Sequence, residues 1–365
     1  MKKNGIKNVV AFTAGGIGDF VMATSAISLI KQYDKNIKLT LITFDSFFKL
    51  VNPKLKIDDG ILISNKFFNH KYKFIRYPYK FFWFIKTFFK LYKRETIIFL
   101  DISKALAVAS KYIYKIKNII GPSNRQFGLD IKNPTAKYYS QIIQMPKNND
   151  DIHMALRYQL IIRLIFPTCN LSLPMLVHTK YLESKIIESR FMQNSKKYKI
   201  ALLLHGSFIG KTWKVNNVIK LINLISKFHS EISFFIVGST LQQKEEGDYL
   251  QKQFVNIDIR NLCGKTSLLE LIEFLKKIDL LISVDTGIVH LSAALKIPAI
   301  VLYGSGLPKH AMPLYHKDIC LYEGAKCSPC DKERFFGKIC KNPICINSIN
   351  SEIVFECLKG ILFVE

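Results

Sequence analysis

The residues best suited, by type and spacing, to binding or catalysis form a short polar turn, Asp285-Thr286-Gly287, which follows an apolar run at 280–284. That run is typical of a strand buried in a parallel sheet, and a helix is expected after the turn. The N–H groups and dipole at the start of the helix favour an anion. Gly287 would let a phosphate approach the backbone, Thr286 adds a hydroxyl donor, and His290 follows one turn later. The alternative is a helix cap at Asp285 with a packed histidine.

A glycine-rich loop follows the first expected strand and opens a helix. Its residues Gly15, Gly16 and Gly18 precede Asp19, but Val21 stands where a dinucleotide fingerprint has Gly or Ala. The incomplete motif therefore disfavours a dehydrogenase-like protein. Asp19 is either the cap of the helix or a carboxylate that could act as a general base, and the loop by itself favours the cap.

Two more loops follow expected buried strands. The first, 205–213, carries Lys211 among glycines, and the second begins at Gly238. Lys211 is suited to a phosphate contact, although a solvated lysine is the simpler interpretation. Because ligands of open α/β sheets bind at the carboxyl ends of the strands, these loops and the Thr286 turn predict a common binding region.

Five of the eight cysteines lie between residues 320 and 345, and four of them have the spacing of metal ligands. The pattern Cys-x2-Cys-x9-Cys-x4-Cys is formed by Cys327, Cys330, Cys340 and Cys345. In a chain expected to be cytoplasmic, this spacing favours a structural Zn or Fe site over disulfides. Four thiolates leave no open position, so a catalytic metal is not expected. The alternative is a set of free thiols.

The elements that position these residues alternate between strand and helix, which predicts an α/β fold with parallel sheets. One set of elements runs to a helix at 151–166, and a second set begins at residue 199. The last helix is expected to cross back to the first domain. The predicted division is an N-terminal domain at 1–175, a C-terminal domain at 176–350 with a Cys-rich loop at 320–345, and the last helix within 351–365.

The chain has a formal net charge of +25, and most of the excess lies in its N-terminal part. Residues 66–94 contain nine basic residues, thirteen aromatics and no acid. This segment could meet an anionic membrane surface, an acidic glycan or a nucleic acid. The alternative is an ordinary amphipathic helix whose core face is formed by Phe81, Phe84, Phe88 and Tyr92.

The N-terminus has no secretory apolar region with a cleavage site, and no apolar run reaches membrane-spanning length. We therefore expect a cytoplasmic protein. Its 365 residues, 49% of them hydrophobic, are sufficient for two domain cores.

Taken together and in this order, the motifs resemble the ADP-heptose:lipopolysaccharide heptosyltransferases, glycosyltransferase family 9. The resemblance covers most of the chain, and the ordered set is more specific than any one member. It rests on the loop 15–19, on Lys211-Thr-Trp213, on Ser267-Leu-Leu-Glu270, on 284–295 with Pro298 downstream, and on Cys327-Ser-Pro-Cys330.

This resemblance implies a GT-B fold, in which two Rossmann-like domains with parallel sheets face a central cleft. The acceptor site would lie in the first domain, at the loop of Gly15, Gly16 and Gly18, and the nucleotide-sugar site in the second. The implied reaction is an inverting transfer that requires no catalytic cofactor. Asp19 would be the general base that takes the proton of the acceptor hydroxyl.

The resemblance also assigns the donor side of the reaction. Lys211, Thr286 and Gly287 would hold the donor diphosphate, and a lysine near a helix N-terminus suits this role because charge builds up on the departing nucleotide. The other donor-side expectations are that Asp285 fixes the loop, that His290 supports it, that Thr266 lies near the base pocket, and that Gly238 belongs to a donor-binding loop.

Three departures from the family pattern are evident. His205 and Lys214 occupy positions where the family commonly has proline. The acid expected to hold the ribose shortly after Gly238 is not clear, and the nearby polar residues are Gln242, Gln243 and Glu245.

The expected function is the transfer of heptose, or a related sugar, from an ADP-sugar to a lipopolysaccharide core acceptor. The basic N-terminal half suits an anionic glycolipid acceptor at the inner face of the inner membrane, with peripheral contact of the protein there. Alternatives within the family are an autotransporter protein, an outer-core acceptor or a capsule acceptor. The alternative from another class is a basic nucleic-acid-binding protein with a Cys-metal module, which the ordered phosphate loops disfavour.

Overall fold

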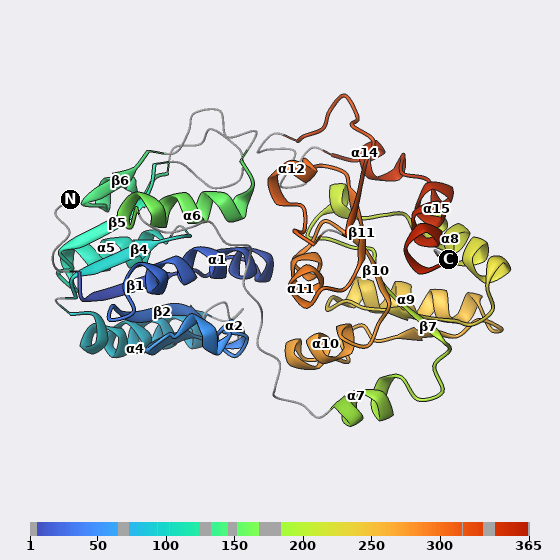
Figure 1. Cartoon of the computed structure of the whole chain (residues 1–365), viewed down its shortest axis with the longest axis horizontal. Coiled ribbons are helices and arrows are strands. Elements are labelled where there is room, and N and C mark those ends of the chain that lie inside the picture. The colour runs from blue at the N-terminus through green and yellow to red at the C-terminus, as the bar shows by residue number, and fades with distance from the viewer. Residues whose placement is uncertain are drawn as a thin grey trace. The chain divides into compact units, whose positions relative to one another are not determined.

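The chain divides into two compact units, Met1–His178 and Thr179–Glu365 (Figure 1). Each unit contains one six-stranded sheet whose neighbouring strands are all parallel, which is the predicted α/β class. The boundary predicted at residue 175 lies outside the described residues. The computed structural model describes residues 6–64, 73–92, 94–101, 103–123, 133–144, 152–167, 184–315, 317–330 and 340–363.

The first unit alternates strands with helices. Its main elements are β1 (Asn8–Phe12), α1 (Ile17–Tyr33), β2 (Lys38–Phe44), α2 (Asp45–Phe48), β3 (Asp59–Ile63), α4 (Lys73–Leu91), β4 (Thr96–Phe99), α5 (Lys104–Tyr112), β5 (Asn118–Pro122), β6 (Gln141–Ile143) and α6 (Met154–Ile165). The strand order is β3-β2-β1-β4-β5-β6. The central strands β1 and β4 are buried on both faces, which explains their continuous apolar runs.

Helices cover both faces of this sheet. Helix α1 packs against α6, and Gln159 Nε2 of α6 donates a hydrogen bond to Ser25 Oγ of α1 (3.1 Å). Helices α4 and α5 share a core cluster with alternate residues of β1, including Val10 and Phe12. The loop that precedes α1 is thereby fixed at the carboxyl end of the central strand.

Helix α4 is the described part of the basic, aromatic segment. Phe84 and Phe88 pack against the core, as the amphipathic alternative predicts. Phe81 and Tyr92 were predicted for the same face but are exposed, so the predicted core face is wrong in these two positions. The physical reason is that α4 is apolar on two sides, and periodicity alone does not identify the buried one. None of the described helices is long and apolar enough to cross a membrane.

The second unit repeats the alternation. Its main elements are α7 (Ser184–Phe191), β7 (Tyr198–Leu203), α8 (Val215–Phe228), β8 (Ile232–Ile236), α9 (Leu241–Gln253), β9 (Ile259–Asn261), α10 (Leu268–Leu275), β10 (Leu280–Val284), α11 (Gly287–Leu295), β11 (Ala299–Tyr303), α12 (Pro308–Ala311), β12 (Ile319–Tyr322), α14 (Ile344–Asn347) and α15 (Ser351–Leu362). The strand order is β12-β11-β10-β7-β8-β9.

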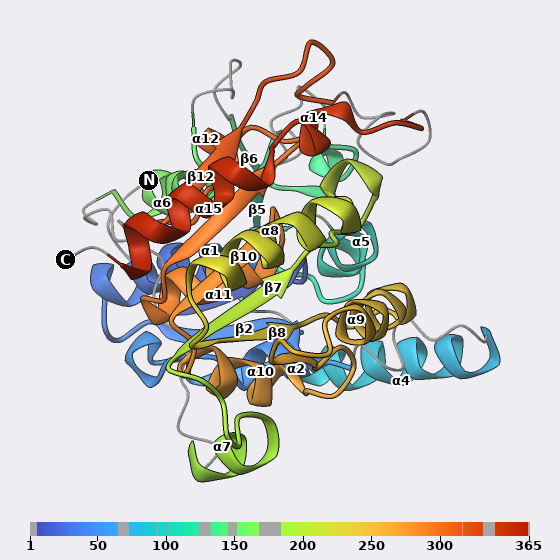
Figure 2. The ribbon, with the colours of Figure 1, turned by 90° about the vertical axis from the view of Figure 1, so that its right-hand side faces the viewer.

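The last helix belongs to the second unit. Figure 2 shows α15 alongside α8, and Val354 and Leu358 of α15 are buried in the same core cluster as Leu221 and Ile225 of α8. The described part of this helix therefore contributes to the core of the second unit. The expectation that it crosses back to the first domain stays a prediction.

Candidate functional site

The glycine-rich loop of the first unit is held by Asp101, which the sequence analysis missed. Asp101 follows β4, the neighbour of β1 in the sheet. Its Oδ2 atom accepts hydrogen bonds from Thr13 Oγ1 (2.8 Å), the Ala14 amide (2.8 Å) and the Gly15 amide (3.0 Å). Burial raises the pKa of the Asp101 carboxyl, although these hydrogen bonds oppose the shift. The signal in the sequence was an acid directly after a buried apolar run.

Tyr158 of α6 connects Asp101 with the predicted base. Its hydroxyl lies 3.3 Å from Asp101 Oδ1 and also hydrogen-bonds the Asp19 side chain. Burial, followed by the charges of the two carboxylates, raises the pKa of Tyr158 well above its ordinary value. Tyr158 is therefore a neutral hydroxyl shared by two acids, and it too was missed by the sequence analysis.

The N-cap residue of α1 is Gly16, and Asp19, the third residue of the helix, completes the cap with its side chain. Its Oδ2 accepts a hydrogen bond from the Gly16 amide (2.8 Å) at the start of α1, and the side chain is half-buried. The Asp19 side chain also lies so close to the backbone of residue 15 that a Cβ there would be 2.8 Å from Asp19 Oδ2, which explains why this residue is glycine. Gly18 is buried within α1. Capping through one oxygen is compatible with a role for the carboxylate as a base, and that role stays a prediction.

In the second unit, the sheet brings Lys211 and Asp285 together. Strand β10 pairs with β7 on one side and with β11 on the other, so the loops after these strands are neighbours. Lys211 Nζ lies 2.5 Å from Asp285 Oδ2, and the two side chains are 16% and 12% exposed. The Ser305 amide donates to the Gly210 carbonyl (3.3 Å), which ties the Lys211 loop to the loop after β11. The result is a largely buried ion pair at the carboxyl edge of the sheet.

The Thr286 turn leads directly into α11. Thr286, and not Asp285, is the N-cap residue, and its hydroxyl lies 3.3 Å from Ser283 Oγ rather than on a first-turn amide. Helix α11 thus begins at Gly287, only two residues after Asp285 of the ion pair. His290 is buried in the same helix.

The loop after β8 is organised by Gln243. Its Oε1 accepts hydrogen bonds from the Ser239 amide (2.7 Å) and the Thr240 amide (2.9 Å), and its Nε2 donates to the His205 carbonyl (3.1 Å). A Cβ at position 238 would lie 2.6 Å from Gln243 Oε1, so Gly238 is required by local packing.

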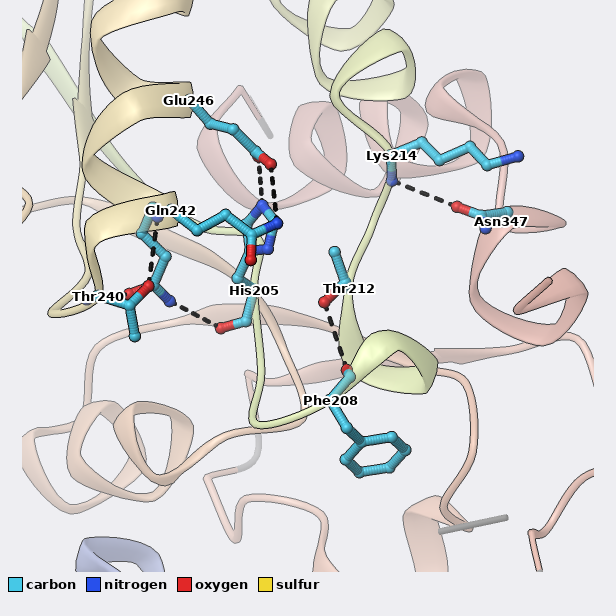
Figure 3. Close-up of polar contacts among 9 residues, drawn as sticks. His205, Phe208, Thr212, Lys214, Thr240, Gln242, Glu246 and Asn347 are labelled. Atoms are coloured by element: carbon cyan, nitrogen blue, oxygen red, sulfur yellow. Dashed lines mark hydrogen bonds and ion pairs between the residues drawn. The ribbon is translucent and has the colours of Figure 1, made fainter. Parts of the chain in front are cut away.

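His205, one of the departures from the family pattern, has an acidic partner in α9. Its Nε2 contacts the Glu246 carboxylate (Figure 3). The pair borders a pocket of about 450 Å³, whose lining also includes Lys214, Gln242 and Lys341. The predicted donor residues lie outside this lining. Ile209 and Thr212 do line it, so the pocket adjoins the loop that carries Lys211.

Thr266 lies in the loop between β9 and α10. It precedes Ser267, the N-cap of α10, whose capping partner Glu270 forms an ion pair with Arg190 of α7. Strand β9 is three positions from β10 in the sheet, which corresponds to roughly 14 Å. The loops that carry the predicted donor residues thus follow different strands of the same sheet.

None of the four cysteines predicted as metal ligands forms a disulfide in the described part of the chain, and Cys345 is buried whereas Cys327 is exposed. Across the described ranges, no three His, Cys, Asp or Glu side chains are grouped so as to hold a metal ion. The segment does contact the loop after β11, because the Cys330 amide donates to the Ser305 carbonyl (2.9 Å). The Zn or Fe site stays a prediction that rests on sequence spacing.

Comparison with known proteins identifies a family. The chain matches the model of glycosyltransferase family 9 (heptosyltransferase) over residues 145–339, just over half of its length. It is 26% identical over 355 residues to a lipooligosaccharide heptosyltransferase 2 of Campylobacter jejuni, covering 95% of each chain.

Solved structures share the fold. An E. coli ADP-heptose lipopolysaccharide heptosyltransferase II has a TM-score of 0.74 at 16% identity, covering 97% of this chain and 98% of its own. The E. coli heptosyltransferase WaaC with ADP has a TM-score of 0.65 at 15% identity, covering 97% and 99%. The predicted GT-B fold is confirmed, and the nucleic-acid-binding alternative loses its support. By sequence and fold, the chain belongs to glycosyltransferase family 9 and is a glycosyltransferase.

Proposed function

We propose that this protein transfers heptose from ADP-heptose to an anionic glycolipid, the core of lipopolysaccharide, with inversion at the sugar. The Campylobacter relative is a lipooligosaccharide heptosyltransferase, and the structural relatives include one solved with ADP. The observation that carries the proposal is the buried Lys211–Asp285 pair beside the start of α11. A cation and a helix N-terminus at one point are suited to a diphosphate.

On the donor side, the diphosphate takes the place of Asp285 as the partner of Lys211. The bond between the anomeric carbon and the diphosphate oxygen breaks, and the electron pair leaves with ADP. Lys211 and the first N–H groups of α11 stabilise the charge that builds up on the leaving oxygen. This stabilisation requires no catalytic metal.

On the acceptor side, Asp19 takes the proton of the attacking hydroxyl, and the oxygen forms the new bond to the anomeric carbon. Asp101 and Tyr158 position the loop and the carboxylate, as their hydrogen bonds indicate. We place the acceptor at the inner face of the inner membrane, where a growing lipopolysaccharide core would be presented.

The test is an assay of the purified chain with ADP-heptose and core acceptors, in which ADP release and the acceptor mass are followed together. Lys211→Met should lower kcat about 100-fold, because it removes one donor to the leaving group. The exposed Lys220→Met on α8 is the matched control. Failure to transfer a sugar from any nucleotide-sugar would overturn the proposal.

A test of Asp19 as the base requires a substitution that preserves its hydrogen bond at the start of α1. In Asp19→Asn the amide oxygen can still accept from the Gly16 amide, so α1 should remain folded while turnover falls about 100-fold or more. Asp34→Asn, at the end of the same helix, is the control. Retained turnover in Asp19→Asn would remove Asp19 as the base without affecting the assignment of the donor site.

The acceptor assay also separates the alternatives within the family. Mass shifts on an autotransporter protein, an outer-core fragment or a capsule fragment, with none on the inner core, would redirect the acceptor assignment. A structural metal is a further proposal from the Cys spacing. About one Zn or Fe per purified chain, lost in Cys327→Ser, would support it, and metal-free protein would refute it.

A further inference from the structure

Helix α4 has a buried apolar face that is fully engaged. Trp83 and Leu91 are buried, while Phe84 and Phe88 pack against the core of the first unit. Trp83 Nε1 also donates a hydrogen bond to the Leu62 carbonyl of β3 (2.8 Å). These contacts fix the rotation of α4 about its axis, so the opposite face is held outward.

The outward face is also apolar. Phe81, Phe82, Ile85, Phe89 and Tyr92 are 63%, 67%, 43%, 79% and 39% exposed. Their spacing follows the helical repeat, so the first four lie along one stripe of α4, the long helix at the lower edge of the first unit in Figure 1, and Tyr92 extends the stripe directly after the helix ends. Single exposed apolar residues are ordinary, but a contiguous stripe of five large ones marks an interaction surface.

The charges on α4 are all of one sign. Its sequence contains five Lys or Arg and no acid. Lys86 is exposed at the border of the stripe, one helical turn from Phe82 and from Phe89, whereas Lys90 is paired with Asp59 (2.8 Å). A lysine stem can lie along apolar surface while its ammonium group reaches an anion. The surface thus combines aromatic rings with cations, which is the composition of a helix that lies in a lipid interface.

We propose that the outward stripe of α4, formed by Phe81, Phe82, Ile85, Phe89 and Tyr92, docks the protein on an anionic lipid surface. The rings enter the boundary between headgroups and acyl chains, and Lys86 contacts headgroup phosphates. The helix lies on the bilayer and does not span it, in agreement with its charge content.

A second copy of the chain is the less favoured occupant. A twofold contact through this stripe would bring α4 against an identical helix and oppose lysine to lysine, with no acid on the helix to pair with them. An anionic bilayer supplies the missing negative charge without this conflict. The inference deepens the proposed action at a membrane, but its test measures lipid binding and is independent of sugar transfer.

The experiment is sedimentation of the full chain with vesicles of phosphatidylcholine, with and without 30% phosphatidylglycerol. We expect binding to the anionic vesicles that weakens in high salt. The double variant Phe82→Ser and Phe89→Ser should weaken binding at least tenfold, and Lys86→Gln about fivefold. The matched controls are Val255→Ser, 88% exposed in the second unit, and the exposed Lys252→Gln of α9, which should bind like the wild type.

A fluorescence measurement reports on the stripe itself. Phe89→Trp should show a blue shift of its emission on adding anionic vesicles, because the ring leaves water. Unchanged circular dichroism and melting temperature confirm that the exposed substitutions leave the fold intact. Equal vesicle binding by the wild type and the double-Phe variant would overturn the proposal. A dimer that the same variant makes monomeric, with no vesicle binding, would assign the stripe to self-association instead.

Discussion

Replacing Asp101 tests what holds the glycine-rich loop: the hydrogen-bond-accepting oxygen of this side chain or its negative charge. Asp101→Ala removes the acceptor for Thr13 Oγ1 and for the amides of Ala14 and Gly15. Asp101→Asn is isosteric. Its amide oxygen can accept from the same three donors, and its NH2 group then faces Tyr158, whose hydroxyl can accept a hydrogen bond.

The expected cost differs between the two variants. Each buried donor left without a partner costs about 1–3 kcal/mol, and the three are neighbours whose costs do not add fully. We expect Asp101→Ala to lower the free energy of unfolding by about 3–5 kcal/mol and Asp101→Asn by about 1–2 kcal/mol or less. Urea unfolding followed by circular dichroism measures both values. Equal losses in the two variants would refute the reasoning, because charge and not shape would then be required.

The pH dependence supplies a second measurement. Because burial raises the pKa of the Asp101 carboxyl, the folded chain holds this proton more tightly than the unfolded chain, in which the Asp pKa is about 3.9. The stabilisation from this group is therefore complete below about pH 4 and declines as the pH rises toward the folded-state pKa. Asp101→Asn lacks the titration. Its stability deficit relative to the wild type should thus shrink between pH 4 and pH 8, and a constant deficit would contradict the shift.

Activity provides the third measurement. In Asp101→Asn, the Tyr158 hydroxyl is released to donate to Asp19. A donated hydrogen bond favours the ionised carboxylate, so the acidic limb of the kcat–pH profile should move to lower pH. A merely structural role of Asp101 would lower kcat or stability without moving that limb.

Four further substitutions have outcomes that follow from local features of the structure. Gly15→Ala places a Cβ 2.8 Å from Asp19 Oδ2 and should lower kcat at least tenfold. In Gly360→Ala, the new Cβ in α15 meets no neighbour within 4 Å. This substitution should raise the free energy of unfolding by about 0.5–1 kcal/mol, as urea unfolding would show. Burial raises the pKa of Asp318 to about 7, so its contribution to wild-type stability should decline from about pH 4 to pH 7, and Asp318→Asn should abolish that slope in urea unfolding. Glu246→Gln removes the carboxylate partner of His205 beside the pocket and should change the melting temperature by only a few degrees, since the carboxylate is one-third exposed. A complete loss of folding would show that the pair is structural.

The strands could be predicted because their burial leaves a local mark. Strands β1 and β10 are buried on both faces, so each appears as an apolar run, and the run at 280–284 is strand β10 in the structure. The Thr286 turn and the start of α11 follow from the same local pattern. The family motifs then connected separate loops that no single pattern could have joined.

The parts that escaped prediction depend on contacts between distant segments. Asp101 became recognisable only once β4 was known to pair with β1, and Tyr158 only once α6 was known to pack on α1. Helix α4 has apolar residues on two sides, so its period predicted Phe81 as core when the structure exposes it. The metal site that the spacing of Cys327 and its neighbours predicts stays a prediction, because spacing does not fix where side chains lie in three dimensions.

The Lys211–Asp285 pair reconciles two demands on the proposed donor site. A lysine that is only 16% exposed needs a counterion before the donor arrives, because an unpaired buried charge is costly. Yet a carboxylate beside a diphosphate site would repel the donor if it stayed in place. Asp285 meets both demands if it holds Lys211 in the empty site and releases it to the diphosphate, whose oxygens can bind Lys211 and the first amides of α11 together. On this argument, Asp285 sets the position of the lysine and the strength of donor binding, while the charge stabilisation in the transition state belongs to Lys211 and the helix.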